Sequence, residues 1–416
     1  MISYAAAQEE FARHQIDTEA ALARLEQLAV SLHCWQGDDV GGFEKVEATR
    51  AGGGTLVTGN YPGRARTIEE LQADLDQVLK LVPGRKRLNL HACYGDFRSR
   101  KVDRDGITVE HFEGWIEWCR SRGMGLDFNP TFFAHPRAES GFTLSHADPA
   151  IREFWIAHGI ACRKVAAEAG RRLGSPVITN FWIPDGYKDL PADRFSPRQR
   201  LEESLDRIFD ETLDPVLTRD AVESKLFGIG SESYVVGSHE FYLGYAVKRQ
   251  KIYCLDMGHF HPTESVADKI SSILLFVPEL LFHVSRGVRW DSDHVVLWDD
   301  PTRAVAEELV RGNCLERTHV GLDFFDASIN RIAAWTLGTR NVQKAFLSAL
   351  LLPNEQLRQL EAEGDFTARL ALMEDAKTLP MGAVWAEWCR RHGVPGDGEW
   401  LGEVKAYELS VLRNRS

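Results

Sequence analysis

Two aspartates separated by one residue are the first sign of chemistry in this sequence. Asp291 and Asp293 lie in the stretch RWDSDHVVLWDD, residues 289–300, beside His294 and just before a strand-like pair of valines. In an extended chain, residues i and i+2 point to the same side. Two carboxylates on one side repel each other unless they are solvated, protonated or neutralised by a cation. The spacing alone leaves these three possibilities open, and the rest of the sequence must decide among them.

Other acids and histidines fall near the ends of predicted strands, in an order that could bring them together. One set takes three carboxylates and one imidazole from four successive predicted strands: Glu223, Asp256, His283 and Asp323. A second set has fewer protein ligands and leaves positions for water or substrate, as a catalytic metal requires: His259, Asp291 and Asp293. Hard oxygen ligands suit Mn²⁺, Mg²⁺ or Co²⁺ better than a thiol-preferring metal.

Each of these residues also has an ordinary structural explanation. An isolated Asp-Ser-Asp is more often a turn or a helix cap, and His283 in an apolar run is more often a buried histidine bonded to a carbonyl. Glu223 and Lys225 could form a simple ion pair on one strand face, while Trp35 and Trp182 are more typical of a core. Only the coincidence over four consecutive strand ends favours a metal.

Eight apolar segments are predicted to be strands: residues 28–35, 87–94, 125–133, 176–184, 221–229, 251–259, 280–286 and 319–328. Amphipathic segments lie between them, such as residues 67–83, with Thr67 as N-cap, and residues 149–174, which end on Gly174. This alternation predicts a (β/α)₈ TIM barrel of class α/β, with active-site groups at the carboxyl ends of the strands. An open doubly wound sheet is the alternative, and the missing Gly-rich phosphate fingerprint disfavours it.

The domain organisation follows from where the strand pattern stops. Residues 1–340 are predicted to form the barrel, including an N-terminal helix, and residues 341–416 a C-terminal helical extension. The 416 residues are 44% hydrophobic and 26% charged, which is typical of a globular protein. The net charge of −12 disfavours nucleic acid and anionic membranes as partners.

We expect a cytoplasmic protein. The first residues, MISYAAAQEEFARHQ, lack a signal-peptide pattern, and the longest apolar stretch, residues 271–284, is too short to span a membrane. Seven scattered cysteines without a C-x-x-C pair are predicted to be reduced, mostly buried thiols.

Ten stretches, in order along the chain, resemble the L-rhamnose isomerase family within the xylose-isomerase-like barrels. They are HCWQGDDV, TGNYPG, KRLNLHA, GLDFNP, GFTLSHAD, WIPDG, AVESKLFGIG, GHFHPTE, VRWDSDHVV and HVGLDFFDASINRIAAW, between about residues 31 and 335. The resemblance implies a (β/α)₈ barrel, a homotetramer and two divalent-metal sites per subunit, usually Mn²⁺, with Co²⁺, Zn²⁺ or Mg²⁺ possible. It also implies cytoplasmic interconversion of L-rhamnose and L-rhamnulose in rhamnose catabolism.

The resemblance also implies roles for individual residues. The family's structural metal ligands fall on Glu223, Asp256, His283 and Asp323, and its catalytic metal ligands on His259, Asp291 and Asp293. The lysine near the first metal falls on Lys225 and the ring-handling histidine on His91. Catalysis is accordingly assigned to His91, Lys225, Asp291 and Asp323, and substrate binding to Trp35, Phe133, Trp182 and Lys225.

An aldose–ketose isomerisation moves one hydrogen between C1 and C2 and one proton between two oxygens, without a redox cofactor. The hypothesis is a metal-mediated hydride shift in which metal-bound water shuttles the proton; an enediol route with a carboxylate base stays open. His91, with a near-neutral pKa, would help to open the sugar ring. Two other functions stay open: a related aldose isomerase acting mainly on L-mannose, D-allose or D-xylose, and a metal-dependent hydrolase of small phosphoesters on the same barrel.

Overall fold

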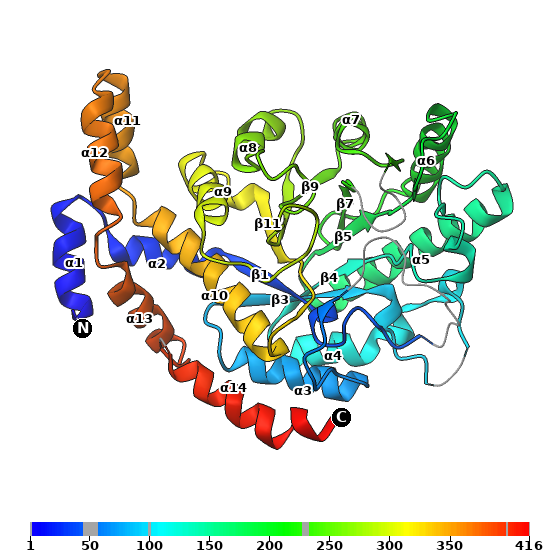
Figure 1. Cartoon of the computed structure of the whole chain (residues 1–416), viewed down its shortest axis with the longest axis horizontal. Helices are drawn as coiled ribbons and strands as arrows, with labels where there is room; N and C mark the ends of the chain where they lie inside the picture. Colours follow the sequence, from blue (N-terminus) through cyan, green and yellow to red (C-terminus); the bar gives the residue numbers. More distant parts are fainter. Residues whose placement is uncertain (1, 45–56, 99–100, 227–232, 397, 416) are drawn as a thin grey trace.

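The computed structural model describes residues 2–44, 57–98, 101–226, 233–396 and 398–415 (Figure 1). Eight parallel strands close into a barrel: β1 (Ala29–His33), β3 (Arg85–His91), β4 (Gly125–Asn129), β5 (Val177–Trp182), β7 (Thr218–Glu223), β9 (Ile252–Asp256), β10 (Leu280–Val284) and β11 (Thr318–Leu322). Each strand pairs with the next in sequence, and β11 pairs with β1. All eight predicted strands and the predicted TIM barrel are confirmed.

The strand register brings chemically active residues to one level of the barrel. Trp182 on β5 pairs with Glu223 on β7, and Asp256 on β9 pairs with His283 on β10. All four lie at or near the carboxyl ends of their strands, where a parallel barrel gathers its functional groups. The apolar runs that precede them are buried on both faces, as expected of parallel strands.

Helices cover the outside of the barrel: α3 (Ile68–Leu79), α4 (Glu113–Ser121), α5 (Pro149–Leu173), α6 (Phe195–Ile208), α7 (His239–Arg249), α8 (Ala267–Leu274) and α9 (Asp300–Arg311). The predicted caps are confirmed. The Thr67 side chain accepts a hydrogen bond from the backbone N–H of Glu70, and Gly174 ends α5 with a positive φ of 64°. Two short two-stranded sheets connect loops. One pairs β2 (Thr58–Gly59) with β12 (Asp326–Ala327), and the other pairs β6 (Gly186–Tyr187) with β8 (Tyr234–Val235).

Helices from both ends of the chain pack together beside the barrel: α1 (Tyr4–Arg13), α2 (Thr18–Gln27), α10 (Arg331–Leu350), α11 (Asn354–Ala362), α12 (Phe366–Ala376), α13 (Met381–Arg391) and α14 (Glu399–Ser410). Helix α13 contacts α1, and α10 contacts α2, α3 and α9. Helices α11 and α12 project from the body (Figure 1). The predicted boundary at residue 340 lies inside α10, and the division into two domains stays a prediction.

Buried charge fastens the C-terminal segment to the barrel. Arg415 donates to both carboxylate oxygens of Asp74 on α3, at 2.6 and 2.8 Å, and Tyr407 donates to the same carboxylate at 2.8 Å. The side chains of Arg415 and Asp74 are only 4% and 1% exposed. This ion pair therefore holds the end of the described chain against α3.

The segment RWDSDHVVLWDD is a loop between β10 and α9, so the expected strand-like conformation is wrong. Arg286 and His294 form an isolated antiparallel bridge, while Arg289 and Asp293 have positive φ angles of 71° and 41°. The argument that i and i+2 share one side of a strand therefore does not apply to Asp291 and Asp293. Loop geometry brings both to the same cavity instead.

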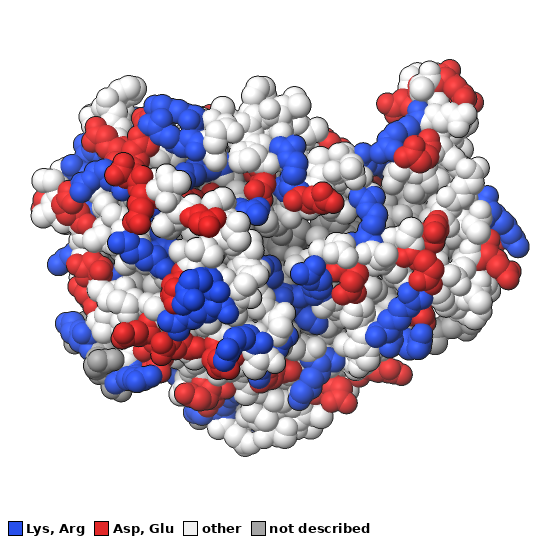
Figure 2. Space-filling model, turned by 180° about the vertical axis from the view of Figure 1, so that it is seen from behind, with Lys and Arg blue, Asp and Glu red and all other residues white. Residues whose placement is uncertain are grey.

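The charged surface is mixed. On the face seen from behind, basic and acidic side chains are interspersed and the basic ones do not gather into one patch (Figure 2). Exposed ion pairs such as Lys248 with Glu202, at 2.6 Å, are common. Among the described residues, no helix is both long enough and apolar enough to cross a membrane.

Candidate active site

A cavity opens at the carboxyl ends of the barrel strands. Most residues predicted for the site line it: Trp35, His91, Phe133, Trp182, Glu223, Lys225, His259, His283, Asp291, Asp293 and Asp323. Asp256 is 1% exposed, and its Oδ2 lies 3.9 Å from His259 Nε2 and from His283 Nδ1. The structure thus brings together every residue predicted for the site. Residues 227–230 of the AVESKLFGIG stretch lie outside the described part of the chain.

The first predicted ligand set forms a tight cluster. Glu223, Asp256, His283 and Asp323 each offer a ligand atom, and these atoms all lie within 4.8 Å of one another. His283 Nδ1 is 3.2 Å from Glu223 Oε2 and 3.1 Å from Asp323 Oδ2. Both His283 nitrogens and Asp256 Oδ2 are buried without a hydrogen-bond partner in the described structure. Because buried polar atoms are normally hydrogen-bonded, these atoms fit a bound cation.

The second predicted set lies beside the first. His259 Nε2 is 3.3 Å from Asp291 Oδ2, and His259 Nδ1 is 3.5 Å from Glu223 Oε1. Lys225 Nζ contacts the same Asp291 oxygen at 3.1 Å. Asp291 Oδ1 and His259 Nδ1 are buried and make no hydrogen bond within the described residues, so this set also has ligand capacity to spare.

Burial and mutual repulsion perturb these groups strongly. Burial raises the pKa of Asp256 to about 7, and burial together with the charge of Asp291 raises the pKa of Asp293 well above its usual value. Burial alone would lower the pKa of His259, but Asp256 and Asp291 raise it to about 10. Without an ion, protons therefore stabilise the cluster, and a divalent cation would replace them.

Lys225 and His283 supply the opposite charge. Burial would raise the pKa of Asp291, yet Lys225 and His259 hold it well below its usual value. In the same way, the His283 imidazole holds the pKa of Asp323 below its usual value in spite of burial. The site therefore keeps Asp291 and Asp323 ionised, whereas Asp256 and Asp293 bind protons more readily.

Aromatic rings form one wall of the cavity. Ring centroids are 4.8 Å apart between Trp35 and His91, 5.4 Å between His91 and Phe133, and 5.6 Å between Phe133 and Trp182. Lys225 Nζ lies 5.1 Å from the centroid of the Trp182 ring. An apolar wall facing a few fixed polar groups is the usual form of a small-molecule site.

His91 is neutral in this setting. Burial lowers the pKa of His91 to about 4, so the expected near-neutral value is wrong. Its Nδ1 lies 3.3 Å from Thr131 Oγ1. A neutral imidazole can accept a proton or a hydrogen bond, but it does not carry a charge near neutral pH.

Arg104 supports the aromatic wall from outside. It is 2% exposed, pairs with Glu44 at 2.8 Å, and donates to the carbonyl oxygens of Thr131, Phe133 and Ala134. Three bonds from one rigid guanidinium fix the backbone that carries Phe133.

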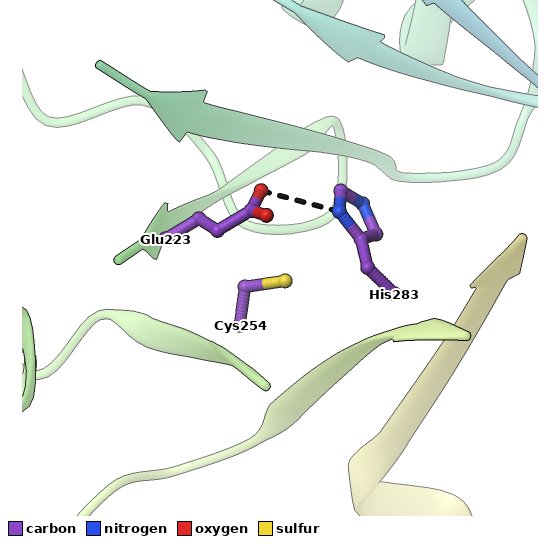
Figure 3. A group of neighbouring side chains, drawn as sticks. All are labelled: Glu223, Cys254 and His283. Atoms are coloured by element: carbon purple, nitrogen blue, oxygen red, sulfur yellow. Dashed lines mark ion pairs between the residues drawn. The ribbon is translucent and has the colours of Figure 1, made fainter. Parts of the chain in front are cut away.

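Two residues of this region were not singled out from the sequence. Asn180 on β5 lines the cavity and donates to Glu223 Oε2 at 2.6 Å. Cys254 on β9 lies within 4.8 Å of ligand atoms of Glu223 and His283 (Figure 3). The available signals were a polar residue inside the apolar run PVITNFW and a thiol two residues before Asp256.

Three other polar residues near strand ends do not line the cavity. His33 lies against the carbonyl of Phe324, and Asp185 accepts four hydrogen bonds from Thr143 and Ser145. Asp326 accepts from Ser328 and from the backbone of Val295. These are supports of the surrounding loops.

The comparisons with known proteins agree over the whole chain. The family model of L-rhamnose isomerase (RhaA) matches residues 2–415. The L-rhamnose isomerase of Rhodopirellula baltica is 60% identical over 410 residues, covering 99% of this chain and 96% of that protein. The L-rhamnose isomerase of Salmonella paratyphi A is 59% identical over 410 residues, covering 99% and 97%.

The comparison with solved structures also finds more distant proteins. An L-ribulose 3-epimerase aligns over 80% of this chain and 98% of its own, with 11% identity and a TM-score of 0.48, which carries no argument about function. The family match over residues 2–415 and the 60% identity over nearly the full length lead to one conclusion. This chain belongs to the L-rhamnose isomerase family.

Proposed function

We propose that this enzyme interconverts L-rhamnose and L-rhamnulose with two divalent cations, Mn²⁺ by preference. The observation that carries the proposal is the cluster of Glu223, Asp256, His283 and Asp323, with unsatisfied buried atoms, in a chain 60% identical to an L-rhamnose isomerase. The second set is His259, Asp291 and Asp293. Oxygen-rich ligands favour Mn²⁺ over thiol-preferring metals.

The bound cations would supply positive charge to the two sugar oxygens on which negative charge develops. The protein's own residues do the rest. Lys225, held 3.1 Å from Asp291, would add a positive charge beside the proposed catalytic metal ligands. Trp35, Phe133 and Trp182 cover the apolar face of the sugar and exclude water from it. Trp35 Nε1 also donates to Asp323 Oδ1 at 2.9 Å and so keeps that carboxylate aimed at the site.

His91 acts before the isomerisation. Because its pKa is lowered to about 4, His91 is neutral and can accept the proton of the anomeric hydroxyl while the bond from C1 to the ring oxygen breaks and that oxygen takes a proton from water. Its place between Trp35 and Phe133 in the wall sets it against the edge of a bound sugar ring. Ring opening then delivers the open-chain sugar to the charged side of the cavity.

We also propose a cytoplasmic homotetramer. Two observations favour self-association: α12 has no buried residue, and its Phe366 and Leu370 are 58% and 57% exposed. Apolar side chains exposed on a projecting helix are typical of a surface that another subunit covers. Light scattering of the purified protein would give the oligomeric state directly.

A metal-depletion assay tests the proposed function. The protein is stripped with EDTA, incubated with L-rhamnose, and then supplied with Mn²⁺ while ketose is measured. Ketose should form only after Mn²⁺ is added, and kcat/KM should be higher for L-rhamnose than for L-mannose, D-allose or D-xylose. Ketose formation in EDTA, or none with any divalent cation, would contradict the proposal. With L-rhamnose that carries deuterium at C2, retention of the deuterium in the ketose would favour hydride transfer over the enediol route.

A further inference from the structure

The chain takes an unfavourable backbone conformation where it forms part of the cavity wall. Val40 lines the cavity, and its φ angle is 58°, in the left-handed region. Asp39, the residue before it, has a φ angle of 62°. Aspartate adopts this region more readily than most residues, whereas a β-branched residue is a rare outlier there. Contacts from outside the turn must therefore hold Val40, because such strain persists only where the surrounding structure enforces it.

Arg331 supplies such a contact through Asp39. Its Nε donates to Asp39 Oδ1 at 2.9 Å, and its Nη2 lies 2.7 Å from both carboxylate oxygens. The third nitrogen, Nη1, donates to the carbonyl oxygens of Tyr61 and Pro62, at 2.5 and 3.3 Å. The side chains of Arg331 and Asp39 are 3% and 19% exposed. All three nitrogens of one planar guanidinium are thus engaged, which fixes the direction of the ion pair.

Arg331 is held in turn because it begins α10. The Asn330 side chain caps this helix and accepts hydrogen bonds from the backbone N–H groups of Ile332 and Ala333, at 2.9 and 3.1 Å. Helix α10 packs against α2, α3 and α9. The ion pair therefore ties Asp39 to a firmly packed part of the scaffold.

We propose that Arg331 is a positioning residue for the sugar. Through Asp39 it holds Val40 in the left-handed conformation that keeps the Val40 side chain in the cavity wall. Arg331 itself does not line the cavity, so it acts on the sugar only through this turn. The effect on the sugar rests on the proposed function, whereas the hold on the turn does not, and the two are tested apart.

Hydrogen exchange of the full-length protein without sugar tests the hold on the turn. The backbone N–H of Val40 donates to the carbonyl oxygen of Trp35 at 3.1 Å. Arg331→Lys keeps the charge but loses the fork of donors, and Asp39→Asn keeps the size but loses the charge. Each should speed exchange of the amides of residues 37–43 by roughly tenfold or more, while exchange in β4 stays within about twofold.

Steady-state kinetics with L-rhamnose and Mn²⁺ test the effect on the sugar. Asp39→Asn and Arg331→Lys should each raise KM by about fivefold or more with kcat within about twofold, because the metal ligands are not touched. Val40→Gly supplies a second arm, since glycine adopts a positive φ without strain. In the Val40→Gly protein, Arg331→Lys should raise KM by less than about twofold. An equal rise in both backgrounds would overturn the proposal.

Arg163 provides a matched control. Its guanidinium makes the same two-pronged contact with Asp220, at 2.9 and 3.0 Å, and donates to the carbonyl oxygens of Ile208 and Glu211. Its side chain is 4% exposed and does not line the cavity. Arg163→Lys should lower the melting temperature but leave KM and the exchange of residues 37–43 unchanged.

The two measurements separate this proposal from the proposed function. If Arg331→Lys fails to fold, Asp39→Asn decides, and unchanged exchange of residues 37–43 in that protein would overturn the hold on the turn. Faster exchange with an unchanged KM would overturn the positioning role. Absence of ketose from the unmodified protein would count against the proposed function alone, because hydrogen exchange does not depend on turnover.

Discussion

Replacing Asn180 with alanine removes the hydrogen bond that orients Glu223, one of the predicted metal ligands. The Asn180 side chain donates to Glu223 Oε2 at 2.6 Å, and both residues are 2% exposed. Without this donor, Glu223 loses a fixed orientation and a partner that stabilises its ionised form. We therefore expect Asn180→Ala to weaken metal binding without touching any ligand.

The size of the effect follows from the bond. A buried hydrogen bond to a charged group contributes about 1.5–3 kcal/mol. At 1.4 kcal/mol per tenfold change, this corresponds to roughly 10- to 150-fold in Mn²⁺ affinity. Loss of a residue that orients a metal ligand typically weakens binding by about 10–100-fold, which agrees with that range.

Calorimetric titration of metal-free protein with Mn²⁺ measures this affinity directly. Asn129→Ala is the matched control, because Asn129 lines the same cavity and is equally buried. Its side chain donates to Asn89 and to the carbonyl of Leu90, not to a predicted ligand. The control should bind Mn²⁺ within threefold of the unmodified protein. An Asn180→Ala protein that also stays within threefold would refute the reasoning.

Three further predictions concern charge. Asp291→Asn should abolish ketose formation while the melting temperature stays near that of the unmodified protein; near-normal turnover would remove Asp291 from the catalytic metal set. Arg415→Ala should lower the urea-derived free energy of unfolding by about 3–5 kcal/mol, because Asp74 stays buried without its partner; a loss below about 1 kcal/mol would contradict this. Burial would raise the pKa of Glu279, but His319 holds it below its usual value, so this carboxylate stabilises the fold above the ordinary glutamate range and loses that effect as pH falls. Glu279→Gln should therefore be less stable near neutral pH, by a difference that narrows in acid; a difference independent of pH would refute it.

The barrel was predictable because its strands are buried on both faces and read as apolar runs. The first residue of a strand was harder to predict where the strand begins with charged residues. β7 starts at Thr218, three residues before the predicted segment, since Arg219 and Asp220 are held in ion pairs. Those partners, Glu279 and Arg163, are distant in sequence. No local pattern reveals them.

In the segment that carries Asp291 and Asp293, the sequence suggested an extended strand where the structure has a loop. Val295 and Val296 are buried, and their β-propensity suggested a strand, but propensity reports burial as much as backbone geometry. The pKa of His91 was mispredicted for a related reason. The pKa depends on how far neighbours from other strands bury the imidazole, which residue type alone does not express.

Arg104 holds the backbone behind the cavity wall, whereas the side chains in front of that backbone give the cavity its shape. Because the guanidinium bonds to backbone carbonyls, the path of the chain around Phe133 does not depend on the Phe133 ring. A variant with a shorter side chain at this position, made to admit bulkier sugars, would therefore keep this backbone support but lose the ring's packing against His91 and Trp182. Arg104 and Glu44 should be left unchanged in such a variant.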